Sequence, residues 1–184
     1  MLSTQVTGKT LGIIGMGRIG TRLARQAKHG FGMRIIYSNR SKVAESVEME
    51  LGAEYCPVDE VFERSDFLSL NCPANQETKP LANRQRMSSM KSTAHLINTA
   101  RGDVVDEEAL ATALSRGEIA GAGLDVYENE PEVLSSLLEL EQVVLLPHLG
   151  SGTVETREAM GFRAVANIEA FAGDSPLPDL IASK

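Results

Sequence analysis

The chain has 184 residues, of which 42% are hydrophobic and 23% are charged, values typical of a soluble protein with one well-buried domain. Its 18 Lys+Arg against 25 Asp+Glu give a net charge of -7, which disfavours nucleic acids and anionic membranes as partners, because both attract basic surfaces. No apolar run approaches the ~18 residues of a membrane helix, and the polar N-terminus lacks the apolar core of a signal peptide. We therefore expect a cytoplasmic protein, with Cys56 and Cys72 as reduced thiols and without a metal site.

Short apolar segments alternate with helical patterns along the chain, and each segment is apolar on both faces. This alternation predicts an α/β fold, a Rossmann-type doubly wound parallel sheet with helices on both faces. We assign residues 1–172 to this domain and residues 173–184 to a C-terminal tail. The expected strands are Leu11–Ile14, Met33–Tyr37, Phe67–Asn71, His95–Asn98, Gly123–Val126 and Val143–Leu146. The expected helices are Arg18–Lys28, Lys42–Leu51, Val58–Arg64, Asn83–Ser89, Glu107–Arg116 and Thr153–Ala172, with Asp106 and Thr153 as N-caps.

A glycine-rich turn follows the first expected strand directly. Its sequence, Gly15-Met16-Gly17-Arg18-Ile19-Gly20, has the G-x-G-x-x-G spacing and leads into an amphipathic helix. In a dinucleotide-binding turn, Gly15 permits the tight bend, Gly17 lets the backbone approach a pyrophosphate, and Gly20 allows close packing of helix on strand. The exposed N–H groups of the helix N-terminus, from Arg18 and Ile19 onward, then hold the anion.

The end of the second strand indicates which dinucleotide is bound. NAD-specific folds place an Asp or Glu about 20 residues after the turn, where it binds the ribose 2′-hydroxyl. This chain instead reads Tyr37-Ser38-Asn39-Arg40, without an acid that would repel a 2′-phosphate. Ser38 and Asn39 can donate hydrogen bonds, and Arg40 offers a charge-assisted contact. We therefore expect NADP(H) to be the preferred cofactor, with NAD(H) still possible.

Three polar clusters lie just beyond apolar strands, where open α/β sheets bind their ligands. They are Asn98–Gly102, Tyr127–Pro131 and Pro147–Ser151. Together with the glycine turn, these ordered motifs make essentially the whole chain resemble the D-2-hydroxyacid dehydrogenase family, and in particular its glyoxylate/hydroxypyruvate reductase branch.

The resemblance implies a catalytic role for one residue in each cluster. Arg101 matches the arginine that holds the substrate carboxylate, for which a planar guanidinium is suited. His148 matches the acid/base that protonates the new alkoxide when a 2-keto acid is reduced. Glu130 matches the carboxylate that pairs with this histidine, raises its pKa and orients its ring.

The resemblance also implies further residues around the cofactor. Asp125 matches a residue near the nicotinamide amide. Cys72 and Pro73 match a loop that passes over the cofactor, and Thr78 matches a hydroxyl near the pyrophosphate. The expected cofactor contacts are completed by the strand-end residues Thr99, Ala100, Arg101, His148, Gly150 and Ser151.

Two other histidines are expected to have no catalytic role. His29 falls at a helix C-terminus, where a cation suits the helix dipole. His95 falls within an apolar strand and is expected to be a core residue with satisfied hydrogen bonds.

The chain departs from the family pattern at its N-terminus, because members build most of their substrate domain from residues before the glycine turn. We therefore expect half a cleft, with cofactor binding but little turnover by this chain alone. The tail would return to the missing substrate domain, and the last helix is expected to expose an apolar face. A homodimer is expected for the full-length form, and a small 2-keto or 2-hydroxy acid is the expected substrate.

Two other functions are compatible with parts of the pattern. One is a non-catalytic, corepressor-like module that senses NAD(P), which the retention of Arg101, Glu130 and His148 disfavours. The other is an NAD-dependent phosphoglycerate or lactate dehydrogenase, which Ser38 and Arg40 disfavour, because such sites expect an acid there.

Overall fold

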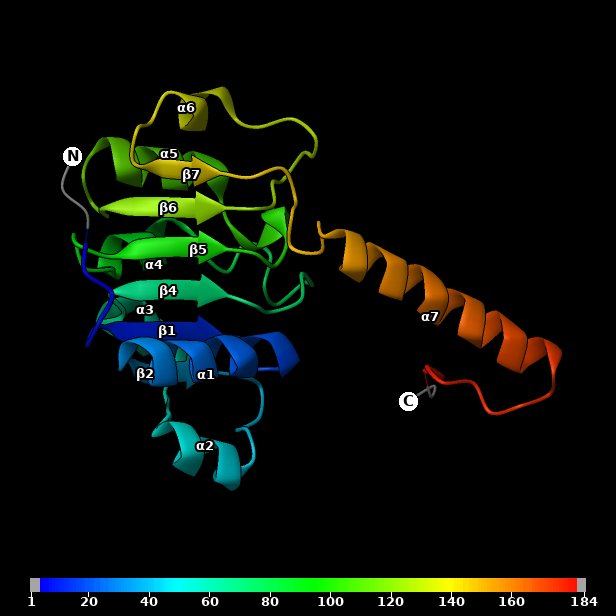
Figure 1. Cartoon of the computed structure of the whole chain (residues 1–184). Coiled ribbons are helices and arrows are strands. Elements are labelled where there is room, and N and C mark those ends of the chain that lie inside the picture. The colour runs from blue at the N-terminus through cyan, green and yellow to red at the C-terminus, as the bar shows by residue number, and fades with distance from the viewer. Residues whose placement is uncertain (1–3, 182–184) are drawn as a thin grey trace. The chain divides into compact units, whose positions relative to one another are not determined.

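A computed structural model describes residues 4–181 of the chain. Its core is a parallel sheet of seven strands connected by helices (Figure 1). The strands are β1 Thr10–Ile14, β2 Arg34–Ser38, β3 Glu54–Tyr55, β4 Phe67–Leu70, β5 His95–Asn98, β6 Gly121–Leu124 and β7 Val143–Leu145. The helices are α1 Arg18–Phe31, α2 Glu45–Leu51, α3 Val58–Arg64, α4 Arg84–Ser89, α5 Glu107–Ser115, α6 Ser135–Leu138 and α7 Val154–Ala172, with a 3-10 turn η1 at Gly102–Val104.

The strand order is β3-β2-β1-β4-β5-β6-β7, and every neighbouring pair is parallel. The order reverses between β1 and β4, since the chain adds strands on one side of β1 and then returns to its other side. Ligands of open α/β sheets bind outside the carboxyl ends of the strands at such a switch point. The predicted Rossmann-type sheet is confirmed.

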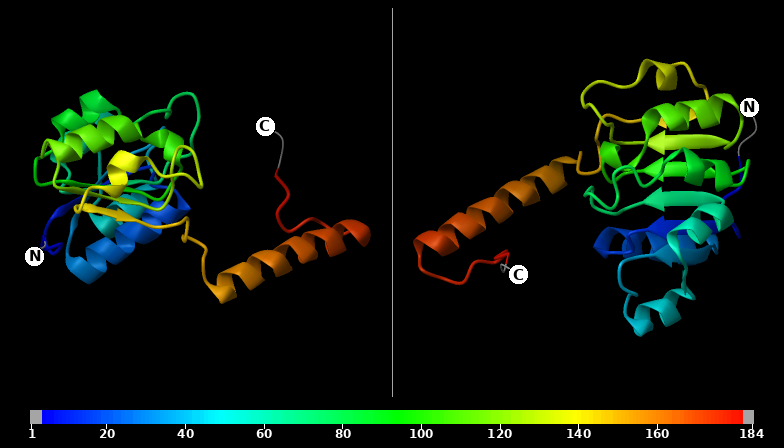
Figure 2. Two further views of the ribbon diagram at one scale, coloured as in Figure 1. Left: turned by 90° about the horizontal axis from the view of Figure 1, so that it is seen from above. Right: turned by 180° about the vertical axis from the view of Figure 1, so that it is seen from behind.

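The two faces of the sheet carry different helices (Figures 1 and 2) and bury different apolar clusters. On the face of α1, the buried cluster is centred on β1 and β2 and includes Ile13, Ile35 and Tyr37. The opposite face carries α3, α4 and α5 over a larger cluster that runs from β2 to β6 and includes Phe62 and Leu96. Both clusters fix β1 and β4, so the backbone at the switch point is held from both sides.

Most predicted elements are present, and the exceptions have local causes. The strand predicted at Gly123–Val126 lies two residues earlier, at Gly121–Leu124. Its glycine is required by packing, because a Cβ at Gly121 would lie 2.9 Å from the Gln142 carbonyl oxygen and from the His95 ring. The helix predicted from Lys42 begins at Glu45. Neither β3 nor α6 is predicted, since segments of two and four residues show no periodicity.

The chain divides into two compact units, Met1–Pro147 and His148–Lys184. The second contains α7, whose N-cap Thr153 accepts a hydrogen bond from the Thr156 N–H as predicted. None of the residues of α7 is buried, and Phe162 and Phe171 are 72% and 76% exposed, which agrees with the expected apolar face. The extent of the Rossmann domain to residue 172 stays a prediction. Among residues 4–181, no helix has both the length and the apolar character needed to cross a membrane.

Candidate functional site

The glycine turn after β1 is held by contacts that only glycine allows. Gly15 has φ 92°, and a Cβ there would lie 2.6 Å from the Cys72 backbone nitrogen, just beyond β4. A Cβ at Gly20 would lie 2.6 Å from the Gly15 carbonyl oxygen. Backbone thus packs on backbone at the switch point, and both glycines fill the places that the motif predicts.

Gly17 differs from these two glycines because no protein atom crowds it: a Cβ there would meet no atom within 4 Å. It is the N-cap of α1, it provides no side-chain cap, and the first turn of α1 contains no acidic residue. The N–H groups of this turn therefore face open space with a positive helix end behind them. A pyrophosphate fits this arrangement in both shape and charge.

A cavity of about 630 Å³ opens beside this turn. Eight of the predicted cofactor residues line it: Gly15, Gly17, Ser38, Asn39, Arg40, Cys72, Pro73 and Thr78. Its other lining residues, which the sequence analysis missed, are Ile14, Ser41, Tyr55, Pro57, Val58, Asn71, Asn75, Glu77 and Leu81. The predicted residues of the first unit that lie outside this lining are Arg18, Ile19, Gly20, Thr99, Ala100, Arg101 and Asp125.

The residues after β2 differ in how free their side chains are. Ser38 ends β2 and is only 5% exposed. The Asn39 amide is bound to Met16: its Oδ1 accepts from the Met16 N–H at 2.6 Å, and its Nδ2 lies 3.4 Å from the Met16 carbonyl oxygen. Asn39 therefore clamps the glycine turn, while Arg40 and Ser41 provide exposed polar groups at the cavity.

The loop after β4 forms the opposite wall of the cavity and is folded on itself. The Thr78 hydroxyl donates to the Pro73 carbonyl at 2.6 Å and accepts from the Asn75 N–H at 2.9 Å. Burial raises the pKa of the Cys72 thiol, which favours an inert neutral thiol over a nucleophile. The wall is thus shaped by a local turn around Thr78.

Arg101 projects from a loop that a buried asparagine shapes. Asn98 is 1% exposed; its Oδ1 accepts from the Ala100 N–H at 3.0 Å and its Nδ2 donates to the Arg101 carbonyl at 2.9 Å. Arg101 itself is exposed, and its Nη1 donates to the Ala100 carbonyl at 2.6 Å. The guanidinium is therefore accessible at the carboxyl end of β5.

The loop that carries Glu130 packs directly against the Arg101 loop. A Cβ at Gly102 would lie 1.9 Å from the Tyr127 carbonyl carbon, so the two backbones touch. The buried Glu107 carboxylate accepts from the Glu128 N–H at 2.7 Å, and the Tyr127 N–H donates to Glu130 Oε1 at 3.1 Å. Neighbouring loops thus present Arg101 and Glu130, both exposed, while Asp125 is buried at 6% exposure.

His148, Gly150 and Ser151 belong to the second unit. His148 is exposed and has φ 55°, a left-handed conformation that is uncommon outside glycine. The Ser151 carbonyl accepts from Arg157 Nε at 3.0 Å. The pairing of His148 with Glu130 stays a prediction.

The two remaining histidines lie away from the cavity. His29 is in the last turn of α1, as expected. His95 stacks on Phe67 with ring centroids 5.1 Å apart, and burial lowers its pKa. The expectation of satisfied hydrogen bonds is wrong for its Nδ1, which is buried without a hydrogen-bond partner among the described residues. Stacking on Phe67 is the contact that holds the face of this ring.

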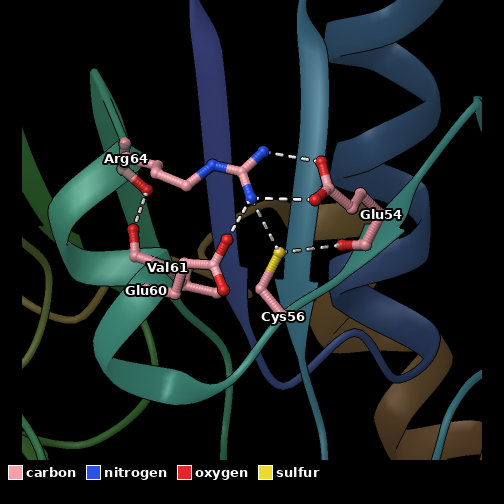
Figure 3. A network of polar contacts seen from close by, with 6 residues as sticks. Glu54, Cys56, Glu60, Val61 and Arg64 are labelled. Atoms are coloured by element: carbon pink, nitrogen blue, oxygen red, sulfur yellow. Dashed lines mark hydrogen bonds and ion pairs between the residues drawn. The ribbon is translucent and has the colours of Figure 1, made fainter.

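One group of potential metal ligands occurs among the described residues, on β3, on α3 and in the link between them (Figure 3). Glu54, Cys56 and Glu60 have ligand atoms within 4.8 Å of one another. The Arg64 guanidinium binds all three, so a cation already occupies the position between them. Burial raises the pKa of Cys56 to about 11, which disfavours the thiolate that a metal requires. The group does not fit a metal ion.

Comparison with known proteins gives consistent matches over most of the chain. The chain is 50% identical over 180 residues to a glyoxylate reductase of Thermococcus onnurineus and 49% identical over 180 residues to one of Pyrococcus furiosus. Both alignments cover 98% of this chain and 53% of the relative, so the chain spans about half the length of these relatives.

Solved structures give the same picture. D-mandelate dehydrogenase of Rhodotorula graminis matches with a TM-score of 0.92 and 34% identity over 99% of this chain and 55% of that chain. An NADPH-dependent glyoxylate/hydroxypyruvate reductase of Sinorhizobium meliloti, in complex with NADP and malonate, matches with a TM-score of 0.88 and 40% identity over 95% and 53% of the two chains. Residues 1–150 match the family described as "D-isomer specific 2-hydroxyacid dehydrogenase, NAD binding domain". The glycine turn, the cavity and the strand-end clusters, except Ser151, lie within this match, and the chain belongs to the D-isomer specific 2-hydroxyacid dehydrogenase family.

Proposed function

We propose that the chain is the cofactor-binding part of an NADP(H)-dependent oxidoreductase that reduces small 2-keto acids, such as glyoxylate and hydroxypyruvate, to 2-hydroxy acids. The relatives named glyoxylate reductase, at about half identity, support the reaction. The neighbour named as an NADPH-dependent glyoxylate/hydroxypyruvate reductase supports the cofactor and the substrate class.

The observation that carries the cofactor preference is the position of Arg40. It lines the cavity beside Ser41, and residues 38–41 contain no carboxylate that would repel a 2′-phosphate. Asn39 also lines the cavity, but its amide is directed to Met16. A phosphate with two negative charges gains most from the guanidinium, because charge-assisted hydrogen bonds are stronger than neutral ones.

The proposed reaction divides the work between the cofactor and this chain. When bound, the reduced cofactor supplies a hydride to the 2-keto carbon. Arg101 holds the substrate carboxylate, for which its exposed guanidinium offers two parallel donors. His148 gives a proton to the carbonyl oxygen as that carbon is reduced, and Glu130 stabilises its charged form. The product is the 2-hydroxy acid.

The test is a parallel titration of the chain with NADPH and NADH, followed through the fluorescence of the reduced nicotinamide, since the chain contains no Trp. We expect NADPH to bind at least about ten-fold more tightly, or about 1.4 kcal/mol. The preference should disappear in Arg40→Asp and persist in Arg25→Asp, which changes an exposed arginine outside the cavity lining. Equal or tighter binding of NADH by the unaltered chain would overturn the NADP(H) proposal.

Turnover is expected to be low for this chain alone, because orienting the substrate and excluding water need a closed cleft. An assay with glyoxylate, hydroxypyruvate and NADPH measures it, and a rate typical of enzymes would contradict that expectation. The homodimer and the cytoplasmic location stay predictions.

A further inference from the structure

Arg64, the last residue of α3, connects the ends of the segment that forms the outer wall of the cavity. Its Nη1 and Nη2 donate to the two carboxylate oxygens of Glu54 at 2.8 and 2.6 Å. Nη1 also donates to Cys56 Sγ at 3.3 Å and to Glu60 (Figure 3). One planar side chain thus closes the segment from β3 through α3 on itself.

The segment needs such a contact because β3 is weakly attached to the sheet. It is an edge strand of two residues that pairs only with β2, and Cys56 adds one further backbone bond to the Tyr37 carbonyl at 2.8 Å. Side chains alternate between faces along a strand, so Glu54 and Cys56 lie on the side of Arg64, whereas Tyr55 lies on the other side. Holding Glu54 and Cys56 therefore fixes the direction of Tyr55.

Tyr55 connects this wall to the glycine turn. It lines the cavity, packs edge-on against Tyr37 with ring centroids 5.4 Å apart, and donates from its hydroxyl to the Asn39 carbonyl at 3.1 Å. Asn39 in turn accepts from the Met16 N–H at 2.6 Å. A continuous series of contacts runs from Arg64 through β3 to the backbone that faces the pyrophosphate.

The contacts of Arg64 are too exposed to contribute much to global stability. Its side chain is 39% exposed and that of Glu54 is 55% exposed, and ion pairs between exposed groups contribute little to folding. Loss of the paired hydrogen bonds between Arg64 and Glu54, the Arg64 fork, should therefore change mainly the local position of the cavity wall. A merely structural residue would instead lower the melting temperature when it is replaced.

We propose that Arg64 is a positioning residue for the adenosine end of the cofactor, acting through Glu54 and Cys56 on Tyr55. The adenosine end is assigned here because the ribose lies at the end of β2 in this fold, next to Arg40 and Tyr55 in the cavity lining. The inference rests on the proposed function and adds a residue that does not itself line the cavity.

The experiment compares Arg64→Met with Arg25→Met. Arg25 is a matched control, because it also binds one carboxylate through two nitrogens: its Nε and Nη2 donate to Glu50 at 2.8 and 2.8 Å. The pair has similar exposure and lies outside the cavity lining. Arg64→Met should weaken the binding of NADPH and of adenosine 2′,5′-bisphosphate by about ten-fold, and leave reduced nicotinamide mononucleotide and the melting temperature nearly unchanged. Arg64→Lys should behave like Arg64→Met, because an ammonium cannot form the fork. Arg25→Met should bind all three ligands as the unaltered chain does.

Unchanged binding in Arg64→Met, equal loss with both half-ligands, or the same loss in Arg25→Met would each overturn the inference. A preference for NADH in the unaltered chain would contradict only the proposed cofactor, and the same variants would then be compared with NADH. If the unaltered chain bound no nucleotide, the inference would be tested by hydrogen exchange of the backbone N–H groups in the absence of ligand. Faster exchange of the Met16 and Cys56 N–H groups in Arg64→Met than in Arg25→Met supports the inference, and equal exchange contradicts it.

Discussion

At two places in the first unit, which we call joints, a glycine lets two backbone segments touch, and different side chains hold the two contacts together. At one joint, Gly15 lets the turn after β1 lie on the backbone that follows β4. At the other, Gly102 lets the loop after β5 lie on the backbone that follows β6. The Gly15 joint is secured by the neutral amide of Asn39, and the Gly102 joint by the buried carboxylate of Glu107.

The two joints also differ in what lies beside them. The Gly15 joint borders an open cavity, whose glycine Gly17 leaves room for a ligand. The Gly102 joint carries exposed Arg101 and Glu130 on adjacent loops. At the Gly15 joint, the backbone itself forms the surface that faces the cavity. At the Gly102 joint, the exposed side chains of Arg101 and Glu130 are positioned by loops that the buried Glu107 carboxylate holds.

The largest effect is expected at the Gly102 joint. In Gly102→Ala the new Cβ would lie 1.9 Å from the Tyr127 carbonyl carbon and 2.2 Å from the Glu128 nitrogen, and backbone atoms cannot yield as a flexible side chain can. Unfolding in urea should show a loss of at least about 3 kcal/mol. The matched control is Gly30→Ala, in α1, where a Cβ meets nothing and the helix gains up to about 1 kcal/mol. Near-normal stability of Gly102→Ala would mean that the two loops are not in contact.

A slightly smaller loss of stability is expected for Gly15→Ala, at about 2–3 kcal/mol, because φ 92° is strained for alanine and the Cβ would lie 2.6 Å from the Cys72 nitrogen. Gly17→Ala is its counterpart. The new methyl group meets no protein atom, so the loss of stability should stay within the cost of alanine at an N-cap, about 1 kcal/mol, while NADPH binding weakens by at least about ten-fold. Normal NADPH binding by Gly17→Ala would contradict the assignment of the open side of the turn to the pyrophosphate.

The bend at Gly15 was predictable from the sequence, because its glycines and the strand and helix around them occupy one continuous segment. The contacts of both joints were not predictable, since the backbones that meet at Gly15 and at Gly102 come from different strand ends and no local pattern marks them. Tyr55 escaped prediction for a related reason: β3 has two residues and shows no alternation. Sequence also indicated that Asn39 is polar and near the cofactor, but not that its amide turns toward Met16. Local geometry can be read from one segment, whereas contacts between segments require the fold.

A pH dependence should separate the two joints. Burial above all raises the pKa of Glu107, against the hydrogen bond from the Glu128 N–H that lowers it, whereas the Asn39 amide does not titrate. The unfolded chain releases this proton near the ordinary glutamate pKa, and the folded protein keeps it to higher pH. The contribution of Glu107 to the free energy of unfolding is therefore complete below the pKa that it has in the unfolded chain. This contribution is lost as the pH rises through the pKa that it has in the folded protein.

Glu107→Gln removes this titration and keeps an acceptor for the Glu128 N–H. Its urea midpoint relative to the unaltered chain should rise as the pH is raised from below the ordinary glutamate pKa toward neutrality. Glu108→Gln, at the exposed neighbouring position, should show no such trend. A constant difference between Glu107→Gln and the unaltered chain at all pH values would contradict a raised pKa.

The smallest effect is expected from two tyrosine hydroxyls, one on each side of the sheet's switch point. Tyr127 donates toward the Leu146 carbonyl at 2.8 Å and lies 3.3 Å from the Leu124 carbonyl; since Leu146 is 44% exposed, water can replace the hydroxyl there. Tyr127→Phe should therefore cost less than about 1 kcal/mol in urea unfolding. Tyr37 is fully buried, donates to Glu48 at 2.6 Å and accepts from the Val43 N–H at 3.1 Å, so Tyr37→Phe removes two hydrogen bonds and should cost about 1–2 kcal/mol. A larger cost for Tyr127→Phe would mean that the strand-end loops, and not the cofactor side, depend most on a single hydroxyl.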